Sequence, residues 1–340
     1  MAADEAAPNY TPETQIDAVG HKGAWLFSDH ADALRAKSCP DDEVFIRPSA
    51  LSINAEPITI GEDQALSENI TGMTLVGAWQ LTADDKNFGG LSGLAVMRSG
   101  SLLAISDAGA WISIGIDPET NAPDGYGSIG YMRNKNGRLF GGKIDGDSEG
   151  LAVRDGLALV SFEQDHRIEA FDLEGCGVGA RAARVTDLPP VIGGQKIPDN
   201  RGAEALGLMA DGRLQVGFEM ANMQGSPQAE VLAKDALAEI TRLQQTGLYL
   251  LTDVDFTDTL SAHVFRAYDP IRGSRVQVRV SSLVSGERTA FADLKAPLLV
   301  DNFEGVAFAK GANGQDRLWL ISDDNFNPRQ RTLLLAFDID

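Results

Sequence analysis

FEGVAFAKGANGQDRLWLISDD, residues 303–324, places an acid at each end of what the pattern predicts to be a β-hairpin. Glu304 precedes a glycine and an apolar run, and a glycine-containing turn then leads into an alternating strand that ends at Asp323 and Asp324. Turns of this kind join antiparallel strands, so the chain returns to the end from which it started. The hairpin therefore predicts that both sets of carboxylates lie on the same face.

Three earlier stretches of the chain repeat this arrangement of acid or serine, small residue, apolar run, turn, strand and acid. They are LSGLAVMRSGSLLAISD (91–107), SEGLAVRDGLALVSFE (148–163) and AEALGLMADGRLQVGFE (203–219). The repeat-start positions Ser92, Glu149, Glu204 and Glu304 are separated by 57, 55 and 100 residues. The last interval holds two periods, and a degenerate copy would fall near residues 246–256.

A period of about 50 to 57 residues with several short strands per unit is typical of a β-propeller blade. Blades bury their faces by stacking around an axis, so residues at one point of each repeat would form a ring. We predict an all-β chain folded as a six-bladed β-propeller. Residues 71–340 would be the propeller domain, and residues 1–70 an irregular N-terminal segment that could contribute strands and the sixth blade. A pair of β-sandwiches is the alternative, but it does not explain the repeated acids.

One stretch departs from the strand pattern and predicts a helix inserted around residues 226–245. Ser226 would be its N-cap and Pro227 its first residue, positions that these residue types favour. The apolar residues that follow have mixed spacings of three, five and six positions. We expect this helix to be a surface insertion between strands.

The composition limits the partners of the chain. Of its 340 residues 43% are hydrophobic, which is enough to bury a core, and no run of 18 apolar residues occurs that would span a membrane. The net charge of −20 disfavours nucleic acid and anionic membranes, because both bind basic surfaces. Such acidity suits divalent cations, although it also simply favours solubility. We expect a monomer.

Seven carboxylates should meet near the mouth of the propeller channel. They are Glu149, Glu204 and Glu304 at strand starts and Asp107, Glu163, Glu219 and Asp323 at hairpin ends. Converging carboxylates raise one another's pKa values and destabilise the fold, and a hard cation relieves this. We predict Ca²⁺, with Mg²⁺ as the alternative, because the four histidines are too scattered for a zinc site. The competing interpretation is that the acids only cap turns at the blade corners.

Two features bear on the compartment. Cys39 and Cys176 do not have a metal-binding spacing; in an exported protein they would form a disulfide, and in a cytosolic one they would be buried thiols. The first residues, MAADEAAPNYTPET, look like a mature N-terminus with an added Met. We expect a periplasmic or secreted protein whose signal peptide is absent from this sequence.

Residues 75–338 resemble the phytase-like family, which is named for esterase-like activity of phytase. The resemblance rests on LSGLAV with ISDAG, DSEGLAV with SFEQ, EALGLMADGRL with GFE, and DNFEGVAF with ISDDNFNPRQRTLLLAFDI. It implies an exported bacterial β-propeller with a metal-dependent phosphoesterase activity. The third repeat departs from the pattern by reading AEALG, and residues 246–300 match poorly.

The acid ring and the resemblance together favour a Ca²⁺-dependent phosphoesterase-like hydrolase with a carboxylate-lined central funnel, acting on a small-molecule ester or phosphoester. Metal ions would neutralise the ring, bind the phosphate and acidify an attacking water. The expected metal ligands are Glu149, Glu204, Glu304, Asp107, Asp324 and Asn302. The expected catalytic acids are Glu163, Glu219 and Asp323, and the expected substrate-binding residues are Arg201, His166 and Arg329.

Two other functions are open from the sequence. Lactonase and arylesterase propellers also hold Ca²⁺ with Glu, Asp and Asn, and Asn302 and Asn325 are placed to help in such a site. A non-catalytic, metal-stabilised binding propeller would need the ring for structure only. A serine nucleophile is disfavoured, because the chain has no G-x-S-x-G elbow in a strand–turn–helix setting.

Overall fold

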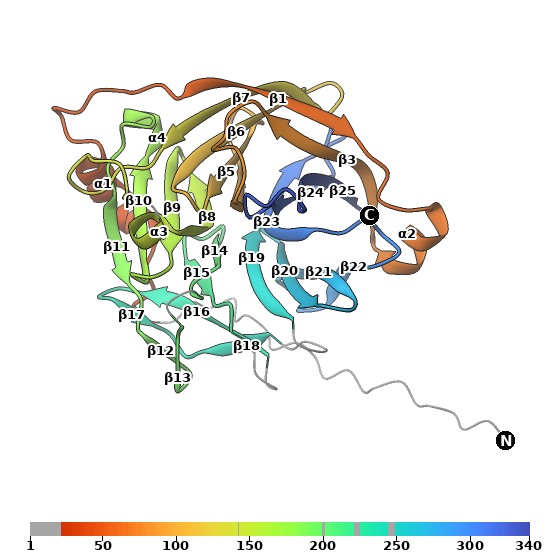
Figure 1. Ribbon diagram of the computed structural model, residues 1–340. Coiled ribbons are helices and arrows are strands. Elements are labelled where there is room, and N and C mark those ends of the chain that lie inside the picture. Colours follow the sequence, from red (N-terminus) through yellow and green to blue (C-terminus); the bar gives the residue numbers. More distant parts are fainter. Residues whose placement is uncertain (1–21, 142, 199–200, 221–224, 244–248) are drawn as a thin grey trace.

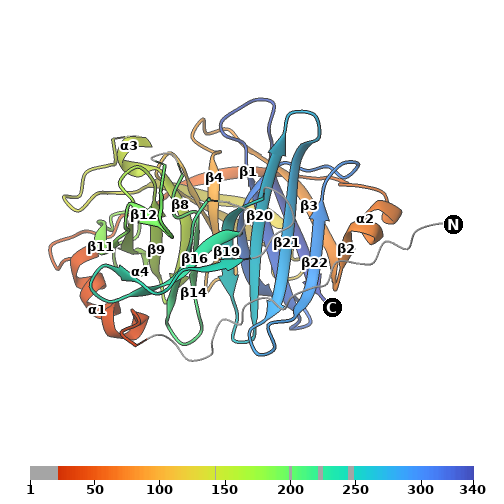
Figure 2. The same cartoon turned by 90° about the horizontal axis from the view of Figure 1, so that it is seen from below.

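The protein is described by a computed structural model that covers residues 22–141, 143–198, 201–220, 225–243 and 249–340. Antiparallel sheets stand around a central axis (Figure 1). In the side view most strands run roughly along this axis (Figure 2). None of the described helices is long and apolar enough to cross a lipid bilayer. The fold is a β-propeller, as the repeats predicted.

Five strands form the inner ring around the axis. They are β4 (Leu91–Val96), β8 (Ser148–Arg154), β14 (Ala205–Leu208), β19 (Leu250–Phe256) and β23 (Asn302–Lys310). Each strand packs against the next in this order, and β23 packs against β4, so the ring is closed. β19 belongs to the degenerate repeat that the sequence places near residues 246–256.

Each inner strand begins a blade of antiparallel strands. The blade of β4 continues with β5 (Leu102–Ser106), β6 (Ala110–Ile116) and β7 (Pro123–Tyr131), and that of β8 with β9 (Leu157–Phe162), β10 (Arg167–Asp172) and β11 (Ala183–Asp187). The blade of β14 continues with β15 (Leu214–Gly217), β16 (Ser226–Leu232) and β17 (Ala236–Leu237), and β18 (Thr241–Leu243) also pairs with β16. The blade of β19 continues with β20 (Leu260–Asp269), β21 (Gly273–Ser282) and β22 (Arg288–Leu294), and that of β23 with β24 (Asp316–Asp323) and β25 (Thr332–Ile339). A separate hairpin consists of β12 (Val191–Ile192) and β13 (Gln195–Lys196).

The N-terminal strands complete these blades. β3 (Met73–Ala83) pairs with β25 as the outer strand of the last blade. β1 (Ser49–Pro57) lies between β3 and β7 and joins two blades in one nine-stranded sheet, while β2 (Ile70–Thr71) extends the blade of β22. The described residues therefore form five blades, and the predicted sixth blade is not confirmed, because the early strands serve as outer strands of blades that already exist.

The helix predicted for residues 226–245 is wrong. Its described part forms β16, β17 and β18, while residues 244–245 lie outside the described residues. All six residues from Ser226 to Val231 are buried, so this segment has two covered faces and lacks the polar face of a surface helix. Lys234 and Asp235 have positive φ and turn the chain back into β17. The mixed apolar spacing therefore reflects a buried strand followed by a tight turn.

The hydrophobic core lies between neighbouring blades. Leu159 of β9 and Leu206 of β14, for example, belong to one cluster of fully buried side chains that joins two blades. Trp79 of β3 and Leu102 of β5 belong to another cluster, which joins the last blade to the first. This packing holds the inner strands at fixed positions around the axis, which in turn positions the side chains at their ends.

The helices lie at the ends and outer edges of the blades. They are α1 (Phe27–Ser38), α2 (Asp63–Asn69), α3 (Lys143–Gly146) and α4 (Leu173–Cys176). α1 packs against β10 and β11, and Cys39 directly after it forms a disulfide with Cys176. The sequence left the state of these two cysteines open. A disulfide is consistent with a protein that folds outside the reducing cytoplasm.

Candidate active site and metal centre

The structure brings the acids of the repeats together at one end of the inner ring. Glu149 and Glu304 lie in the first residues of their inner strands, and Glu204 directly precedes β14. The hairpin-end acids lie at or just beyond the ends of the second strands. We call these seven side chains the acid ring: Asp107, Glu149, Glu163, Glu204, Glu219, Glu304 and Asp323.

Steric crowding explains why a glycine follows the repeat-start residue in three of the repeats. At Gly93, Gly150 and Gly305 a Cβ atom would meet a backbone carbonyl of the neighbouring inner strand. The contacts would be 2.9 Å to Glu149 O, 2.6 Å to Glu204 O and 2.6 Å to Ser92 O, respectively. Each carbonyl belongs to the repeat-start residue of the next blade. The repeat-start residues therefore lie at one level around the axis.

Three carboxylates of one blade form the tightest group. Oxygen atoms of Asp147, Glu149 and Glu163 all lie within 4.8 Å of one another. Asp147 and Glu149 are two positions apart at the start of β8 and so share one face, and Glu163 follows the paired strand β9. The backbone N–H of Glu163 donates to Asp147 O at 2.9 Å, which fixes the two ends of the hairpin together. We call this group the carboxylate cluster.

Asp147 was missed by the sequence analysis, although a signal was present. In DGDSEG, an acid two positions before Glu149 falls on the same side of a β-strand. The other repeats have no acid at this position, so an alignment of repeats hides it. The cluster also changes the position of Glu163, which was expected as a catalytic acid and instead lies among groups that could hold a cation.

Burial and repulsion act together on this half of the ring. Burial raises the pKa of Glu149 well above its usual range, and the negative charges of Glu163 and Glu304 raise it further. Burial likewise raises the pKa of Glu204 well above its usual range, and the negative charges of Glu149 and Glu219 raise it further. Without a counter-ion these carboxylates must take up protons to reduce the repulsion. An all-oxygen donor set of this kind fits a hard divalent cation.

The opposite half of the ring contains a cation of the protein itself. Arg266 of β20 donates from Nη2 to Glu219 Oε1 at 2.6 Å. Its Nη1 lies 2.6 Å from Glu304 Oε1 and donates to Asn302 Oδ1 at 2.6 Å. Burial lowers the pKa of Arg266, but Glu304, Glu219 and Glu204 together raise it by more, so this guanidinium stays charged. The sequence analysis missed Arg266, because it lies in the middle of a strand in the degenerate blade.

Asn302 positions acids on the Arg266 side. Its Nδ2 donates to Glu304 Oε1 at 2.8 Å and to Asp323 Oδ2 at 3.4 Å. Burial raises the pKa of Asp323 to about 8, and the charges of Glu304 and Asp107 add to this shift. Both polar atoms of the Asn302 amide thus bind protein groups, and Asp323 holds a proton at neutral pH.

Both carboxylate oxygens of Asp324 accept hydrogen bonds that hold a loop. Its Oδ1 accepts from the backbone N–H of Gly90 at 2.9 Å and of Phe326 at 3.0 Å, and its Oδ2 accepts from Thr332 Oγ1 at 3.1 Å. Asp107 faces the same glycine, where a Cβ atom would lie only 2.3 Å from Asp107 Oδ1. Gly90 also has a φ of +61°, a region that glycine adopts without strain. The hydrogen bonds of Asp324 therefore fix the loop that contains Gly90, and Asp107 of the ring packs against this glycine.

The three expected substrate-binding residues differ in their placement. Arg201 is about half exposed, and its Nε lies 3.7 Å from Glu219 Oε2, at the edge of the ring. His166 and Glu163 both face Gly202, where a Cβ atom would lie 2.9 Å from His166 Nδ1. Arg329 is exposed in the turn after β24, and its backbone N–H donates to Asn327 Oδ1. In the described part of the chain, no contact places the Arg329 side chain at the ring.

Comparison with solved structures gives distant similarities only. An aldose sugar dehydrogenase from Streptomyces coelicolor in its PQQ-bound form has 13% identity and a TM-score of 0.41, covering 86% of this chain and all of that one. A putative gluconolactonase has 11% identity and a TM-score of 0.42, covering 87% and 95% of the two chains. An α-L-arabinofuranosidase from Lactobacillus brevis has 10% identity and a TM-score of 0.44, covering 73% and 90%. No conclusion about this chain's activity rests on similarities of this size.

Comparison with protein families gives a definite result. No curated protein matches the chain. A family model described as "Phytase-like: Esterase-like activity of phytase" matches residues 86–260 and 234–326. These residues include all five inner strands and every member of the acid ring. The chain therefore belongs to the phytase-like family described by esterase-like activity of phytase.

Proposed function

We propose that this protein is a Ca²⁺-dependent phosphoesterase-like hydrolase whose active site is the acid ring, with Mg²⁺ as the alternative ion. The observation that carries the proposal is the carboxylate cluster, in which Asp147, Glu149 and Glu163 bring oxygen atoms within 4.8 Å of one another. Oxygen ligands in a flexible, multiply charged group favour Ca²⁺. The family supports a hydrolytic reaction on an ester.

The ring divides into residues that would hold the ion and residues that would act on the substrate. Asp147, Glu149 and Glu163 would bind the ion, and Glu204, whose pKa is raised by the charge of Glu149, would contribute a fourth carboxylate. A bound divalent cation supplies positive charge for phosphoryl oxygens and lowers the pKa of a bound water. Glu304, expected from sequence as a ligand, is in contact with Arg266 instead and would position that side chain.

The Arg266 side would bind the anionic part of the substrate. Arg266 and Arg201 both form ion pairs with Glu219, at 2.6 Å and 3.7 Å, respectively. Glu219 would therefore orient two guanidinium groups, which suit phosphate oxygens because of their planar pairs of donors. This assigns Glu219 a positioning role in place of the catalytic role expected from sequence.

Asp323 would provide the proton for the leaving group. With its pKa raised to about 8, it is protonated at pH 7 and can donate a proton to the ester oxygen that departs. Asn302 holds the carboxyl group of Asp323 from one side, and the backbone N–H of Asn325 donates to it at 2.6 Å from the other. The carboxyl group is thus held in one orientation, as a general acid requires.

The experiment is an ester screen at controlled calcium. Purified protein is assayed with p-nitrophenyl phosphate, bis(p-nitrophenyl) phosphate, p-nitrophenyl acetate and a simple lactone, each with Ca²⁺, with Mg²⁺ and with a chelator. Turnover of a phosphoester that the chelator abolishes supports the proposal. Turnover of the acetate or the lactone alone indicates the lactonase or arylesterase reaction. Failure to turn over any ester in Ca²⁺, with calcium binding intact, would leave a non-catalytic binding propeller.

The disulfide supports a further part of the proposal, which is that the protein works in the periplasm or outside the cell. Cys39 and Cys176 are 137 positions apart and join the end of α1 to α4. In a chain-entropy view such a link stabilises the fold by about 5 kcal/mol, a contribution that a reducing cytoplasm would remove. Fractionation of cells that carry the natural gene, with the protein assayed in each fraction, tests this location.

A further inference from the structure

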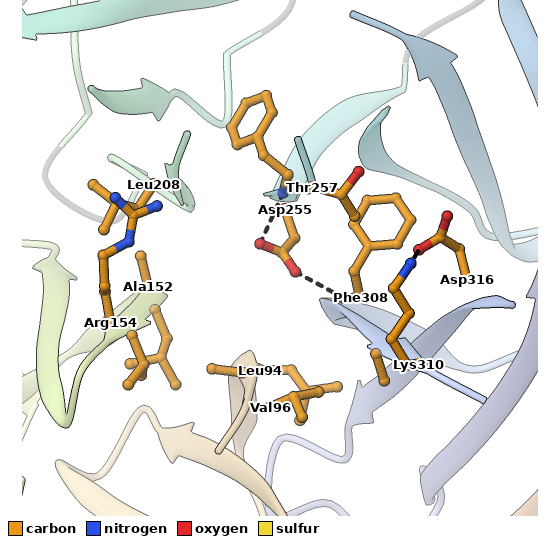
Figure 3. A pocket seen from close by; sticks show the side chains of 15 residues that line it. Leu94, Val96, Ala152, Arg154, Leu208, Asp255, Thr257, Phe308, Lys310 and Asp316 are labelled. Atoms are coloured by element: carbon orange, nitrogen blue, oxygen red, sulfur yellow. Dashed lines mark hydrogen bonds and ion pairs between the residues drawn. The ribbon is translucent and has the colours of Figure 1, made fainter. Parts of the chain in front are cut away.

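A cavity lies at the end of the inner ring opposite the acid ring. It has a volume of about 320 Å³ and is lined by the last residues of all five inner strands, including Leu94, Leu151, Leu208 and Phe308. Because each inner strand starts near the acid ring and ends here, the two sites are separated by the length of these strands. Figure 3 shows side chains from different blades facing one another around this space. We call it the distal cavity.

One carboxylate projects into the distal cavity. Asp255 of β19 accepts from the backbone N–H of Phe256 at 2.8 Å with Oδ1 and from that of Phe308 at 2.7 Å with Oδ2. A carboxylate has about four acceptor positions, so each oxygen can accept a further hydrogen bond. Figure 3 shows the carboxylate directed between the side chains of the facing strands. Burial raises the pKa of Asp255 to about 6, against the lowering effect of these two N–H groups, so it is ionised at pH 7.

Two acids of β19, Asp253 and Asp255, make similar contacts to β23 but differ in their exposure to the cavity. Asp253, two positions earlier, also bridges to β23, because its Oδ2 accepts from the backbone N–H of Val306 at 2.7 Å. Asp253 is almost completely buried, whereas Asp255 is partly exposed and lines the cavity. Both acids thus tie two blades together, but within the described residues only the second presents its charge to the distal cavity.

The positive groups around the distal cavity already have partners. Lys310 Nζ lies 2.6 Å from Asp316 Oδ1 at the rim, as Figure 3 shows. Arg154 donates from Nη2 to Met209 O at 2.7 Å, and its guanidinium lies over the ring of Phe27. Among the described residues no ion pair to Asp255 is recorded. The cavity therefore combines apolar side chains with polar ones, and among its charged groups Asp255 has backbone N–H partners and, within the described residues, no ion pair.

This combination selects one class of ligand. A metal ion would need several oxygen ligands, and the cavity offers one central carboxylate in a space far larger than an ion. An anion would be repelled by Asp255 and by the net charge of −20. A small apolar molecule would fill the space and displace water from the partly exposed carboxylate without supplying a counter-charge, which is unfavourable. An ammonium group on an apolar body meets both requirements.

We propose that the distal cavity binds a small amphipathic amine, whose ammonium group pairs with Asp255 and whose apolar body packs against Leu94, Leu151 and Leu208. The volume is at the lower end of the range for small-molecule pockets, so the ligand is a compact amine with one ring or a short branched chain. This site is independent of the proposed hydrolase reaction, since it shares no residue with the acid ring.

Binding of three probes of similar shape tests the charge requirement. Phenethylamine, 2-phenylethanol and phenylacetate are titrated into the full-length protein at pH 7.5 by isothermal titration calorimetry, in saturating Ca²⁺ to occupy the acid ring. The amine is expected to bind at least about tenfold more tightly than the alcohol, since an ion pair in a partly buried site exceeds a neutral hydrogen bond. Phenylacetate should show no binding. Absence of amine binding, or phenylacetate binding as tightly as the amine, would overturn the proposal.

Variants locate the binding site. Asp255→Asn keeps an acceptor for one backbone N–H and should reduce the preference for amine over alcohol to less than about threefold. Val96→Phe, at the partly exposed cavity wall, should abolish binding of both, whereas Val76→Phe on the exposed face of β3 is the matched control and should bind normally. Glu149→Gln separates the acid ring from the cavity: it should leave amine binding unchanged. If instead Glu149→Gln removes amine binding and Asp255→Asn does not, the amine binds at the acid ring and the inference is wrong.

Discussion

The two halves of the acid ring derive from the same sequence repeat but balance their negative charge by different means. On one side, Glu219 and Glu304 each lie 2.6 Å from the guanidinium of Arg266. On the other, Asp147, Glu149 and Glu163 lie together, and burial and mutual repulsion raise the pKa of Glu149 well above its usual range. One half carries its own cation. In the other half the negative charges lie close together, and uptake of protons or of an external cation would reduce their repulsion.

The difference indicates how one ring could separate ion binding from substrate binding. The guanidinium of Arg266 is held by two carboxylates and an amide and is part of the chain, so this side keeps its cation when metal is removed. The charge of the cluster side would depend on pH and, with the proposed ion, on the calcium concentration. Changes on the two sides should therefore have opposite effects on stability in the absence of metal, and different effects on turnover.

The largest effect is expected from Glu149→Gln on the cluster side. Loss of one of three clustered carboxylates should weaken Ca²⁺ binding and lower turnover on the order of 10³-fold, because a bound divalent ion contributes several kcal/mol to transition-state stabilisation. Calcium titration calorimetry and steady-state assays on the best ester measure both quantities. Glu119→Gln, an exposed turn acid, is the matched control. Unchanged calcium affinity in Glu149→Gln would show that the carboxylate cluster is not the metal centre.

Arg266→Met should show the opposite stability effect on the other side. Removing the cation leaves Glu219 and Glu304 facing each other, which should lower the free energy of unfolding in chelator by about 2 to 4 kcal/mol, a value reduced from that of a fully buried pair because Arg266 is 25% exposed. Urea unfolding at pH 7.5 measures it, with Arg266→Lys as the charge-conserving control. In the same buffer Glu149→Gln should be at least as stable as the unmodified protein, because it removes a repelled charge.

An equal loss of stability in Arg266→Met and Glu149→Gln would contradict the division of the ring into two halves. It would mean that both side chains act only through packing. A gain in Ca²⁺ affinity in Arg266→Met would instead support the division, because it would show that Arg266 keeps Glu219 and Glu304 from binding the ion.

The sequence predicts one half of this arrangement much better than the other. The propeller, the ring position of Glu149, Glu204 and Glu304, and the return of each hairpin to the same end follow from period and turn residues, which are local features. Arg266 could not be found this way, because it enters the ring from a second strand of the degenerate blade, and only blade packing places it there. The contact between Asp324 and Gly90 could not be found this way either, because the two residues are 234 positions apart in sequence.

The blade count and the helix illustrate the same limit. The alternation of apolar and polar residues in β1 and β3 does not reveal whether these strands start a blade or complete one, because strand pairing is non-local. Residues 226–231 are covered on both faces, so they lack the two-residue alternation of apolar and polar side chains that identifies a half-buried strand. Local turn chemistry was reliable in this chain, and partner choice over long sequence distances was not.

A smaller effect is expected for the pH dependence of turnover. Asp323 acts in its protonated form, and its pKa is raised to about 8, so the proton is present below pH 8 and is lost as the pH rises through that value. The turnover number should fall about tenfold per pH unit above pH 8. Asp323→Asn should be slower at pH 7 and nearly independent of pH between 7 and 9. The same alkaline decline in Asp323→Asn would assign the titration to another group.

The smallest effect is expected from Asn302→Ala, which loosens the Arg266 side without removing a charge. The variant loses the hydrogen bonds from Asn302 Nδ2 to Glu304 and from Arg266 to Asn302 Oδ1. Stability should fall by about 1 to 2 kcal/mol, because the buried Glu304 loses a hydrogen bond while the partly exposed Arg266 regains water. KM should rise by less than about tenfold while Ca²⁺ affinity stays the same, since the cluster is untouched. Asn313→Ala in an exposed turn is the control. A fall in Ca²⁺ affinity would show that the two halves of the ring are coupled through Glu304, and the separation of ion binding from substrate binding would then have to be abandoned.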